Sequence, residues 1–308
     1  MPGYKISLFH WAILFASLLL FGSCGSKKKY AETNKIYSQK TRKTADSLKA
    51  ALPSPTIPIK EEKDEETENK KEVPLSKEAK EAMLHREGLR KDLDWVGAIH
   101  FDSRKPNFVI IHHTAQNSVD QTIRTFTLPH TKVSAHYLIG REGEVFQMLN
   151  DYLRGWHAGK GKWGNITDMN SVSIGIELDN NGKEPFPDIQ INALLTLLDT
   201  LKTNYDIPQA NFLGHADIAP SRKNDPSVFF PWKKLYERGF GLWYNESYLL
   251  TPPKDFNALE ALRLIGYDIS DPKAAIRTFK RKFIVTDLSE ELTLYDRTVI
   301  YNLYKRYL

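Results

Sequence analysis

GHADIAPSRKNDPSVFFPW, residues 214–232, is the stretch around which the rest of the chain is interpreted. It holds His215 and Asp225, with Lys223 between them, and its three prolines exclude a continuous helix. An ordered loop of this kind can turn the histidine and the aspartate toward one point, and zinc binds imidazole nitrogen and carboxylate oxygen well. A catalytic zinc takes three protein ligands and keeps one position open. The third ligand must therefore come from another part of the chain.

The best candidate for that ligand lies upstream, in NFVIIHHT, residues 107–114. The apolar, β-branched run at 108–111 predicts a buried strand, and His112 and His113 follow at its end. Because side chains alternate across a strand, only one of these two histidines can face a shared site.

A second predicted strand, VSIGIEL at 172–178, carries a carboxylate among apolar residues. Alternation places Ser173, Gly175 and Glu177 on one face of this strand. Burying a carboxylate among apolar residues is energetically unfavourable, so its presence there indicates a functional role. Glu177 is therefore a candidate general base. The plain alternative is a carboxylate on an exposed strand face.

The remaining pattern alternates strands with helices. Ser118 is a predicted N-cap of a helix that ends at about residue 128, and residues 135–140 and 144–149 flank Arg-Glu-Gly as a hairpin. Residues 188–205 form a predicted amphipathic helix, and 212–214 a short strand. The apolar stripe of that helix consists of Ile191, Leu194, Leu195, Leu198 and Leu201. Strands mixed with helices predict an α/β or α+β domain.

Three motifs together, FVIIHHTA, SIGIELDN and HADIAPSRKNDP, resemble the zinc-dependent N-acetylmuramoyl-L-alanine amidases of the amidase-2 family. That family is similar in fold to the peptidoglycan recognition proteins, and the resemblance spans about residues 90–248. HADIAP-x-RK-x-DP and the later FPW are typical of its membrane-anchored bacterial lipoprotein branch. The resemblance implies a mixed central sheet flanked by helices. It also implies one zinc ion per chain, bound by His112, His215 and Asp225.

The resemblance further implies a reaction. The bond cleaved in peptidoglycan or muropeptides joins the lactyl group of N-acetylmuramic acid to L-alanine, with Glu177 as general base. Lys223 is placed to stabilise the oxyanion, although a loop lysine is often only solvated. The substrate-binding candidates are His113, Thr114, His157 and Arg222, with Arg222 a candidate partner of a stem-peptide carboxylate. We interpret His136 as structural. The alternative from another class is a non-catalytic peptidoglycan-binding or sensing lipoprotein.

The N-terminus has the features of a bacterial lipoprotein signal peptide, residues 1–24. Lys5 precedes an apolar run at 8–21, which is too short to favour a spanning helix, and Gly22-Ser23-Cys24 resembles a lipobox. Cys24 is the single cysteine, so it is the candidate lipidation site and no intrachain disulfide can form. The alternative is an ordinary signal peptide with an incidental cysteine. A lipid anchor predicts a periplasm-facing protein of the cell envelope, with the outer membrane favoured over the inner.

The 308 residues allow two domains behind a tether. Residues 25–86 are polar and predict a mostly disordered spacer, the alternative being a surface helix on the catalytic domain. Residues 87–250 form the predicted catalytic domain. Residues 251–308 carry three predicted helices, at 257–264, 272–283 and 293–307, which resemble a small peptidoglycan-binding module or else a structural appendage. The net charge of +5 gives no reason to expect nucleic acid, and we expect a monomer.

Overall fold

The computed structural model describes residues 35, 39, 42–43, 105–128 and 130–307. The predicted signal peptide, Cys24, nearly all of the predicted tether and the start of the predicted catalytic domain lie outside these residues. Among the described helices, none combines the length and the apolar character needed to cross a bilayer. The described residues from 105 onward belong to one compact unit.

A five-stranded mixed sheet is the centre of this unit, with the strand order β3-β2-β4-β1-β5. β1 (Phe108–His113) lies between β4 (Ser173–Leu178) and β5 (Phe212–Gly214) and is parallel to both. β2 (Tyr137–Ile139) is parallel to β4, and β3 (Val145–Gln147) is antiparallel to β2 at the edge. The predicted mixed central sheet is therefore confirmed.

Local sequence explains these strands. Phe108, Val109, Ile110 and Ile111 are all buried, as expected for a parallel strand covered on both faces. The predicted hairpin is present as β2 and β3, which are shorter than the apolar pattern indicated. Its turn is closed by a hydrogen bond of 2.9 Å from the Gly140 N–H to the Glu144 carbonyl. Gly143 has a φ of 84°, which glycine adopts without steric strain.

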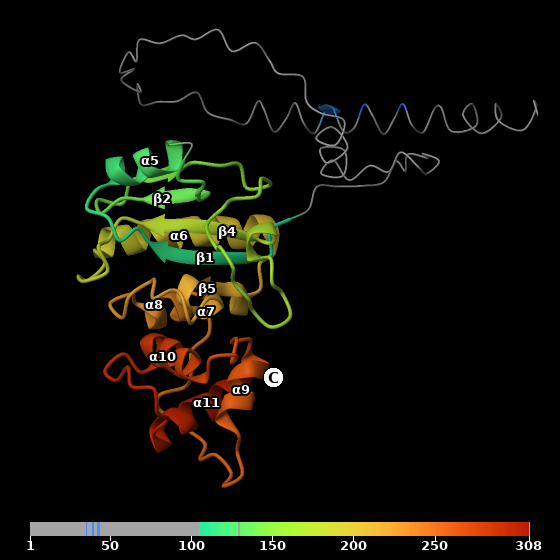
Figure 1. Cartoon of the computed structure of the whole chain (residues 1–308), viewed down its shortest axis with the longest axis vertical. Helices are drawn as coiled ribbons and strands as arrows, with labels where there is room; N and C mark the ends of the chain where they lie inside the picture. Colours follow the sequence, from blue (N-terminus) through green and yellow to red (C-terminus); the bar gives the residue numbers. More distant parts are fainter. Residues whose placement is uncertain (1–34, 36–38, 40–41, 44–104, 129, 308) are drawn as a thin grey trace, which may run out of the picture. The chain divides into compact units, whose positions relative to one another are not determined.

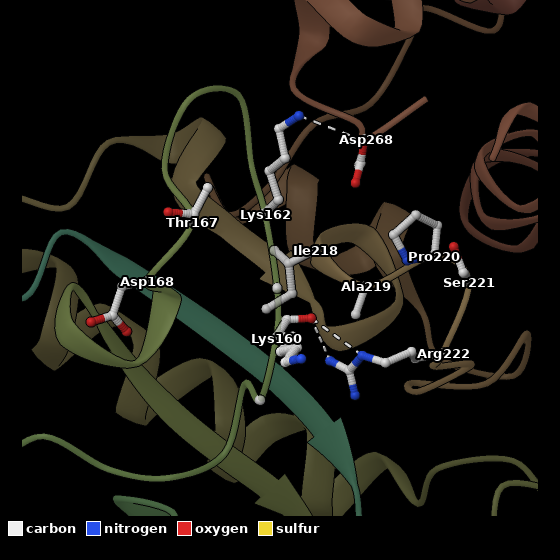
Figure 2. Close-up of a pocket in the computed structure, with 12 residues that line it drawn as sticks. Lys160, Lys162, Thr167, Asp168, Ile218, Ala219, Pro220, Ser221, Arg222 and Asp268 are labelled. Atoms are coloured by element: carbon white, nitrogen blue, oxygen red, sulfur yellow. Dashed lines mark hydrogen bonds and ion pairs between the residues drawn. The ribbon is translucent and has the colours of Figure 1, made fainter. Parts of the chain in front are cut away.

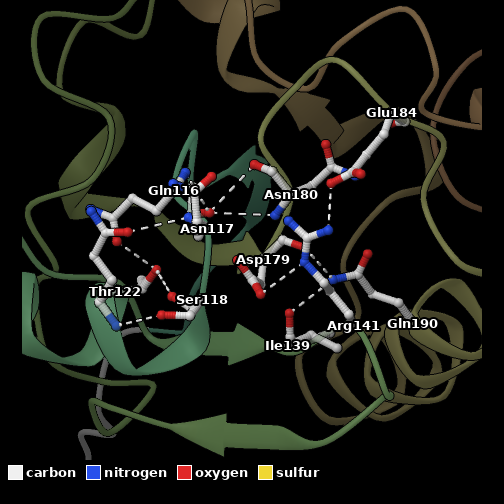
Figure 3. Close-up of polar contacts among 12 residues, drawn as sticks. Gln116, Asn117, Ser118, Thr122, Ile139, Arg141, Asp179, Asn180, Glu184 and Gln190 are labelled. Carbon is white, nitrogen blue, oxygen red and sulfur yellow. Dashed lines mark hydrogen bonds and ion pairs between the residues drawn. The ribbon is translucent and has the colours of Figure 1, made fainter.

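Two helices on the sheet begin where the sequence predicted. α5 (Val119–Thr127) starts at Ser118, whose hydroxyl accepts the Gln121 N–H at 3.2 Å. α6 (Asp188–Tyr205) buries the whole predicted stripe from Ile191 to Leu201. Gln190 of α6 donates to the carbonyls of Ile139 and Asp179, at 3.0 and 3.1 Å (Figure 3). This side chain therefore fastens α6 to the ends of β2 and β4.

Polar contacts also hold the loops at the carboxyl ends of β2 and β4. Arg141 donates to Asp179 at 3.2 Å and to Glu184, so that one guanidinium joins the hairpin turn to the segment after β4 (Figure 3). Nearby, the Thr122 hydroxyl of α5 donates to the Gln116 side chain at 2.8 Å. These contacts hold the loops at the carboxyl-terminal end of β1 and β4 in place.

The C-terminal part of the chain is helical, as predicted. α8 (Trp232–Glu237) precedes α9 (Ala258–Ile265), α10 (Pro272–Phe283) and α11 (Leu294–Tyr307). Figure 1 shows α9, α10 and α11 together beyond β5, next to α7 (His215–Ile218) and α8. One continuous apolar core includes residues of the sheet and of these helices. The C-terminal helices therefore pack as part of the same body as the sheet.

Candidate functional site

The strand register brings two histidines and one glutamate together at the carboxyl ends of β1, β4 and β5. His112 is paired with Glu177 across β1 and β4, and Ile111 is paired with Gly214 across β1 and β5. His215 follows Gly214 directly. Because paired residues on neighbouring strands project from the same face, His112 lies between Glu177 and His215.

Three buried ligand atoms converge at these strand ends. The Nδ1 atoms of His112 and His215 lie 2.9 Å apart, and each lies 3.1 Å from Oδ2 of Asp225. Tetrahedral zinc with bonds of about 2.0 Å would separate its ligand atoms by about 3.3 Å. The nitrogen and oxygen donors and their spacing therefore fit the zinc ion that the sequence predicted.

The segment after β5 positions two of these ligands. His215 begins α7, a single helical turn that ends before Pro220, and the rest of the segment is a loop. The Ala216 N–H donates to the Asp225 carbonyl at 2.8 Å and joins the two ends of that loop. The loop prediction is thus confirmed, with one added turn of helix that carries His215.

The second ring nitrogen of each histidine is also engaged. His215 Nε2 lies 3.1 Å from the Ala158 carbonyl oxygen, and His112 Nε2 lies 3.2 Å from His157 Nδ1. A partner on the second nitrogen fixes the tautomer and orientation of a ligand histidine. His157 itself packs over Gly175, where an added Cβ would lie 2.4 Å from the ring. Gly175 is therefore needed to make room for His157.

Burial and hydrogen bonding set the charges of two of the three ligands. It lowers the pKa of His112 to about 4, and the neighbouring His215 adds to this effect, so that the ring is neutral at pH 7. Burial opposes the ionisation of Asp225, but hydrogen bonds from His112 and His215 hold its pKa well below the usual range. A neutral imidazole and an ionised carboxylate are the forms that bind a metal.

Glu177 has a buried oxygen without a partner. Among the described residues, none makes a hydrogen bond to its Oε2. Burial and then the charge of Asp225 raise the pKa of Glu177 to about 8, and the charge of Lys223 acts in the opposite direction. Lys223 itself is exposed on the loop. A raised pKa in a pocket is characteristic of a group that exchanges protons in catalysis.

A pocket of about 330 Å³ opens over this cluster. All nine of the predicted ligand, catalytic and substrate-binding residues line it: His112, His113, Thr114, His157, Glu177, His215, Arg222, Lys223 and Asp225. The prediction missed Trp156, Val133 and Phe126, which supply an apolar wall. Trp156 is 58% exposed, and its place beside His157 in RGWHAG was an available signal.

Side-chain contacts refine several of these assignments. His113 is not a ligand: its Nδ1 accepts the Ser227 N–H at 3.2 Å, as strand alternation predicts. Thr114 Oγ1 accepts the Gln116 N–H at 3.2 Å and so shapes the chain after β1. His136 is structural, because its Nδ1 accepts the Gly175 N–H at 3.0 Å and its Nε2 lies 2.9 Å from the Leu153 carbonyl.

Arg222 is bound to the backbone of a neighbouring loop. Its Nη2 and Nε donate to the Lys160 carbonyl, at 2.6 and 3.2 Å (Figure 2). Its Nη2 also donates to the Ala158 carbonyl at 3.2 Å. Ala158 is also the contact of His215 Nε2. Arg222 therefore holds the carbonyl that orients a ligand histidine, and it lines both the site and a second hollow of about 520 Å³.

Asn170, for which no role was predicted, supports the same loop. Its side-chain oxygen accepts the N–H groups of His157 and Ala158, at 3.1 and 2.9 Å. Asp217, within HADIAP, was likewise not assigned, although it is buried two residues after His215.

Comparison with known proteins places this site in a family. A family model described as N-acetylmuramoyl-L-alanine amidase matches residues 102–228, which include every pocket residue named above. The N-acetylmuramoyl-L-alanine amidase AmiD of Escherichia coli is 33% identical over 213 residues, covering 61% of this chain and 76% of AmiD. The 1,6-anhydro-N-acetylmuramyl-L-alanine amidase AmpD of Haemophilus influenzae is 32% identical over 170 residues, covering 48% of this chain and 92% of AmpD.

A solved structure agrees with these matches. It is the complex of Escherichia coli AmiD with the substrate anhydro-N-acetylmuramic acid-L-Ala-D-gamma-Glu-L-Lys. Its TM-score is 0.61 at 28% identity, over 71% of this chain and 97% of that chain. Because the sequence relatives exceed 30% identity over most of their own length, this chain belongs to the N-acetylmuramoyl-L-alanine amidase family.

Proposed function

We propose that this protein is a zinc-dependent N-acetylmuramoyl-L-alanine amidase. It hydrolyses the amide bond between the lactyl group of N-acetylmuramic acid and L-alanine in peptidoglycan or muropeptides. The observation that carries this proposal is the convergence of His112, His215 and Asp225 next to the unpartnered Glu177 oxygen. The AmiD structure with an anhydromuramyl peptide supports the substrate class.

His112 Nδ1, His215 Nδ1 and Asp225 Oδ2 are the atoms that would bind zinc. When bound, zinc supplies Lewis acidity, which lowers the pKa of water and polarises a carbonyl. The protein orients the two imidazoles through Ala158 and His157, so that little reorganisation is needed for metal binding.

Glu177 moves protons in this proposal. Its carboxylate takes a proton from the attacking water and delivers one to the departing L-alanine nitrogen, which balances the proton transfers of hydrolysis. The pKa of about 8 applies without a metal, and a nearby divalent cation would lower it toward neutral pH. Lys223 supplies positive charge at the same pocket, where it stabilises the oxyanion of the tetrahedral intermediate.

Mass spectrometry of muropeptide digests tests the reaction. Wild-type protein with zinc should release a stem peptide with a free L-alanine amino group and leave the lactyl carboxylate on the sugar. Glu177→Ala, which keeps the three ligands, is the matched control and should release almost none. Products cut at another bond would assign a different hydrolase activity.

The alternative is a protein that binds peptidoglycan without cleaving it. Such a protein has no need for a raised-pKa carboxyl beside three converging metal ligands. Binding of muropeptides without any cleavage, by protein that has one zinc ion per chain, would favour this alternative.

We also propose that Cys24 anchors the mature protein in the cell envelope, facing the periplasm and held at the outer membrane. The support is the apolar run that ends in Gly22-Ser23-Cys24. Several acyl chains hold a protein on a bilayer far more firmly than one chain does. Wild type should partition into detergent and Cys24→Ala into the aqueous phase. Aqueous partitioning of both would reject the anchor.

A further inference from the structure

A second buried polar cluster lies behind the candidate zinc site. Its centre is Asp217, which is 2% exposed and belongs to α7, two residues after His215. Asp217 Oδ2 accepts the Gly214 N–H at 2.8 Å. The carboxylate therefore holds the backbone directly before the ligand histidine.

The partners of Asp217 come from α10 and from the turn that follows α9. Lys282 Nζ of α10 lies 2.6 Å from Asp217 Oδ2, and the Tyr267 hydroxyl donates to Oδ1 at 2.9 Å. Both side chains are buried, and Lys282 Nζ also lies 3.8 Å from the centre of the Trp232 ring. Each carboxylate oxygen thus has a partner from outside the amidase motifs.

The turn that carries Tyr267 also holds the loop on the other side of His215. The Tyr267 ring packs against Trp163 at 5.0 Å, and the Gly266 carbonyl accepts the Gly164 N–H at 2.7 Å. Figure 2 shows Lys162 extended toward Asp268, with 3.6 Å between the charged atoms.

This loop begins at Ala158, whose carbonyl contacts His215 Nε2. Gly266 is required for the close approach, because an added Cβ would lie 2.4 Å from Trp163. The C-terminal helices therefore restrain both the backbone before His215 and the loop that contacts its ring.

We propose that Lys282 and Tyr267 are positioning residues for His215, and that the C-terminal helices act as a brace for the metal centre. This inference rests on the zinc amidase function proposed above. A buried carboxylate that loses its cation is strongly unfavourable, so Asp217 would move or take up water and release Gly214. Zinc affinity falls when the groups that orient a ligand are lost.

The chain offers a matched control on the same helix. Lys280 is also fully buried and is paired with Asp287 at 2.5 Å and Asp296 at 3.0 Å. Two residues along a helix correspond to about 200° of rotation, so Lys280 and Lys282 face opposite sides. Substitution of either lysine removes a buried charge, but only Lys282 contacts Asp217.

The test measures the zinc dissociation constant of the full chain by competition with a chelator, together with the Tm of each protein. Lys282→Met should raise the dissociation constant roughly 10–100-fold. Tyr267→Phe, which keeps the ring against Trp163, should raise it roughly twofold to tenfold through loss of one hydrogen bond. Lys280→Met should lower the Tm and leave zinc affinity as in wild type.

Two results would overturn the inference alone: wild-type zinc affinity in the Lys282 and Tyr267 variants, or an equal loss of affinity in Lys280→Met. If Lys282→Met does not fold, Tyr267→Phe decides. A wild-type chain that binds no zinc would overturn the zinc-dependent function and this inference together. The wild-type measurement therefore separates the two failures.

Discussion

Asp217 and Asp225 are two buried aspartates of one loop region with opposite surroundings. Asp217 has a lysine ammonium at 2.6 Å and a tyrosine hydroxyl at 2.9 Å. Asp225 contacts two imidazoles, one of which has a pKa of about 4 and is neutral. Among the described residues, none of the lysines or arginines forms an ion pair with Asp225.

The difference shows what distinguishes a structural acid from a functional one. Burying a carboxylate is unfavourable unless a positive charge and hydrogen bonds compensate it. At Asp217 the protein supplies that charge from α10. At Asp225 the described residues supply hydrogen bonds from two imidazoles but no lysine or arginine charge, so the site is suited to an external divalent cation. Burial is common to both acids, and the missing countercharge marks the functional one.

The largest expected effect follows from removing a ligand on the Asp225 side. His215→Ala should reduce bound zinc from one ion per chain to almost none and bring muropeptide cleavage to background, because two ligands rarely hold catalytic zinc. Elemental analysis after dialysis measures this. Full zinc occupancy in the variant would remove His215 from the ligand set.

Glu177→Ala should leave the metal in place and remove turnover. Loss of a positioned general base lowers kcat by roughly 10²–10⁴-fold. Steady-state kinetics and zinc analysis on the same sample separate the two functions. Parallel loss of zinc and activity would show that Glu177 binds the metal or positions a ligand. Two acids, Glu177 and Asp225, would then belong to the metal site, in contrast to Asp217.

Lys223→Ala tests whether the exposed lysine at the pocket opening stabilises the oxyanion. We expect zinc to remain and kcat to fall roughly 10²–10³-fold, as for loss of an oxyanion-stabilising group. A rise in KM with unchanged kcat would instead assign Lys223 to substrate binding. Lys160→Ala is a suitable control, since this lysine lines only the neighbouring hollow.

The last expected effect is on stability rather than on activity, through the buried carboxyl of Glu177. Its pKa of about 8 in the folded, metal-free chain exceeds the ordinary value of 4.5, so the folded state holds this proton more tightly than the unfolded state. The stabilisation is full below about pH 4.5 and is lost as the pH rises to about 8.

Metal-free Glu177→Gln should therefore melt roughly 10 °C above metal-free wild type at pH 8, and the two should converge near pH 4.5. Thermal denaturation with a chelator across this range measures the difference. With zinc bound, the difference should shrink, because the cation stabilises the ionised carboxylate. Equal melting temperatures of the metal-free proteins at pH 8 would show that Glu177 is solvated.

Local patterns were sufficient for much of the fold, and motif resemblance added most of the polar residues of the pocket. The β-branched run before His112, the alternation around Glu177 and the periodicity of α6 each depend on near neighbours, and each prediction is confirmed. Strand alternation and motif resemblance together supplied the role of Glu177, and motif resemblance favoured the role of Lys223; both roles stay predictions until the variants are measured. The boundaries of β2 and β3 were too long, because hairpin pairing ends where the chain turns away from the sheet.

The sequence by itself thus determined the strand with its terminal histidine, the ligand loop and nine of the residues that line the pocket. Only the tertiary structure decided which groups hold that site from behind. Lys282 is 65 residues from Asp217, and Tyr267 is 50 residues away. Periodicity reports which face of a helix is apolar, but not which distant carboxylate a lysine on that helix will contact. The packing of α10 against α7 brings Lys282 to Asp217, and a buried charge is stable only when an opposite charge lies beside it.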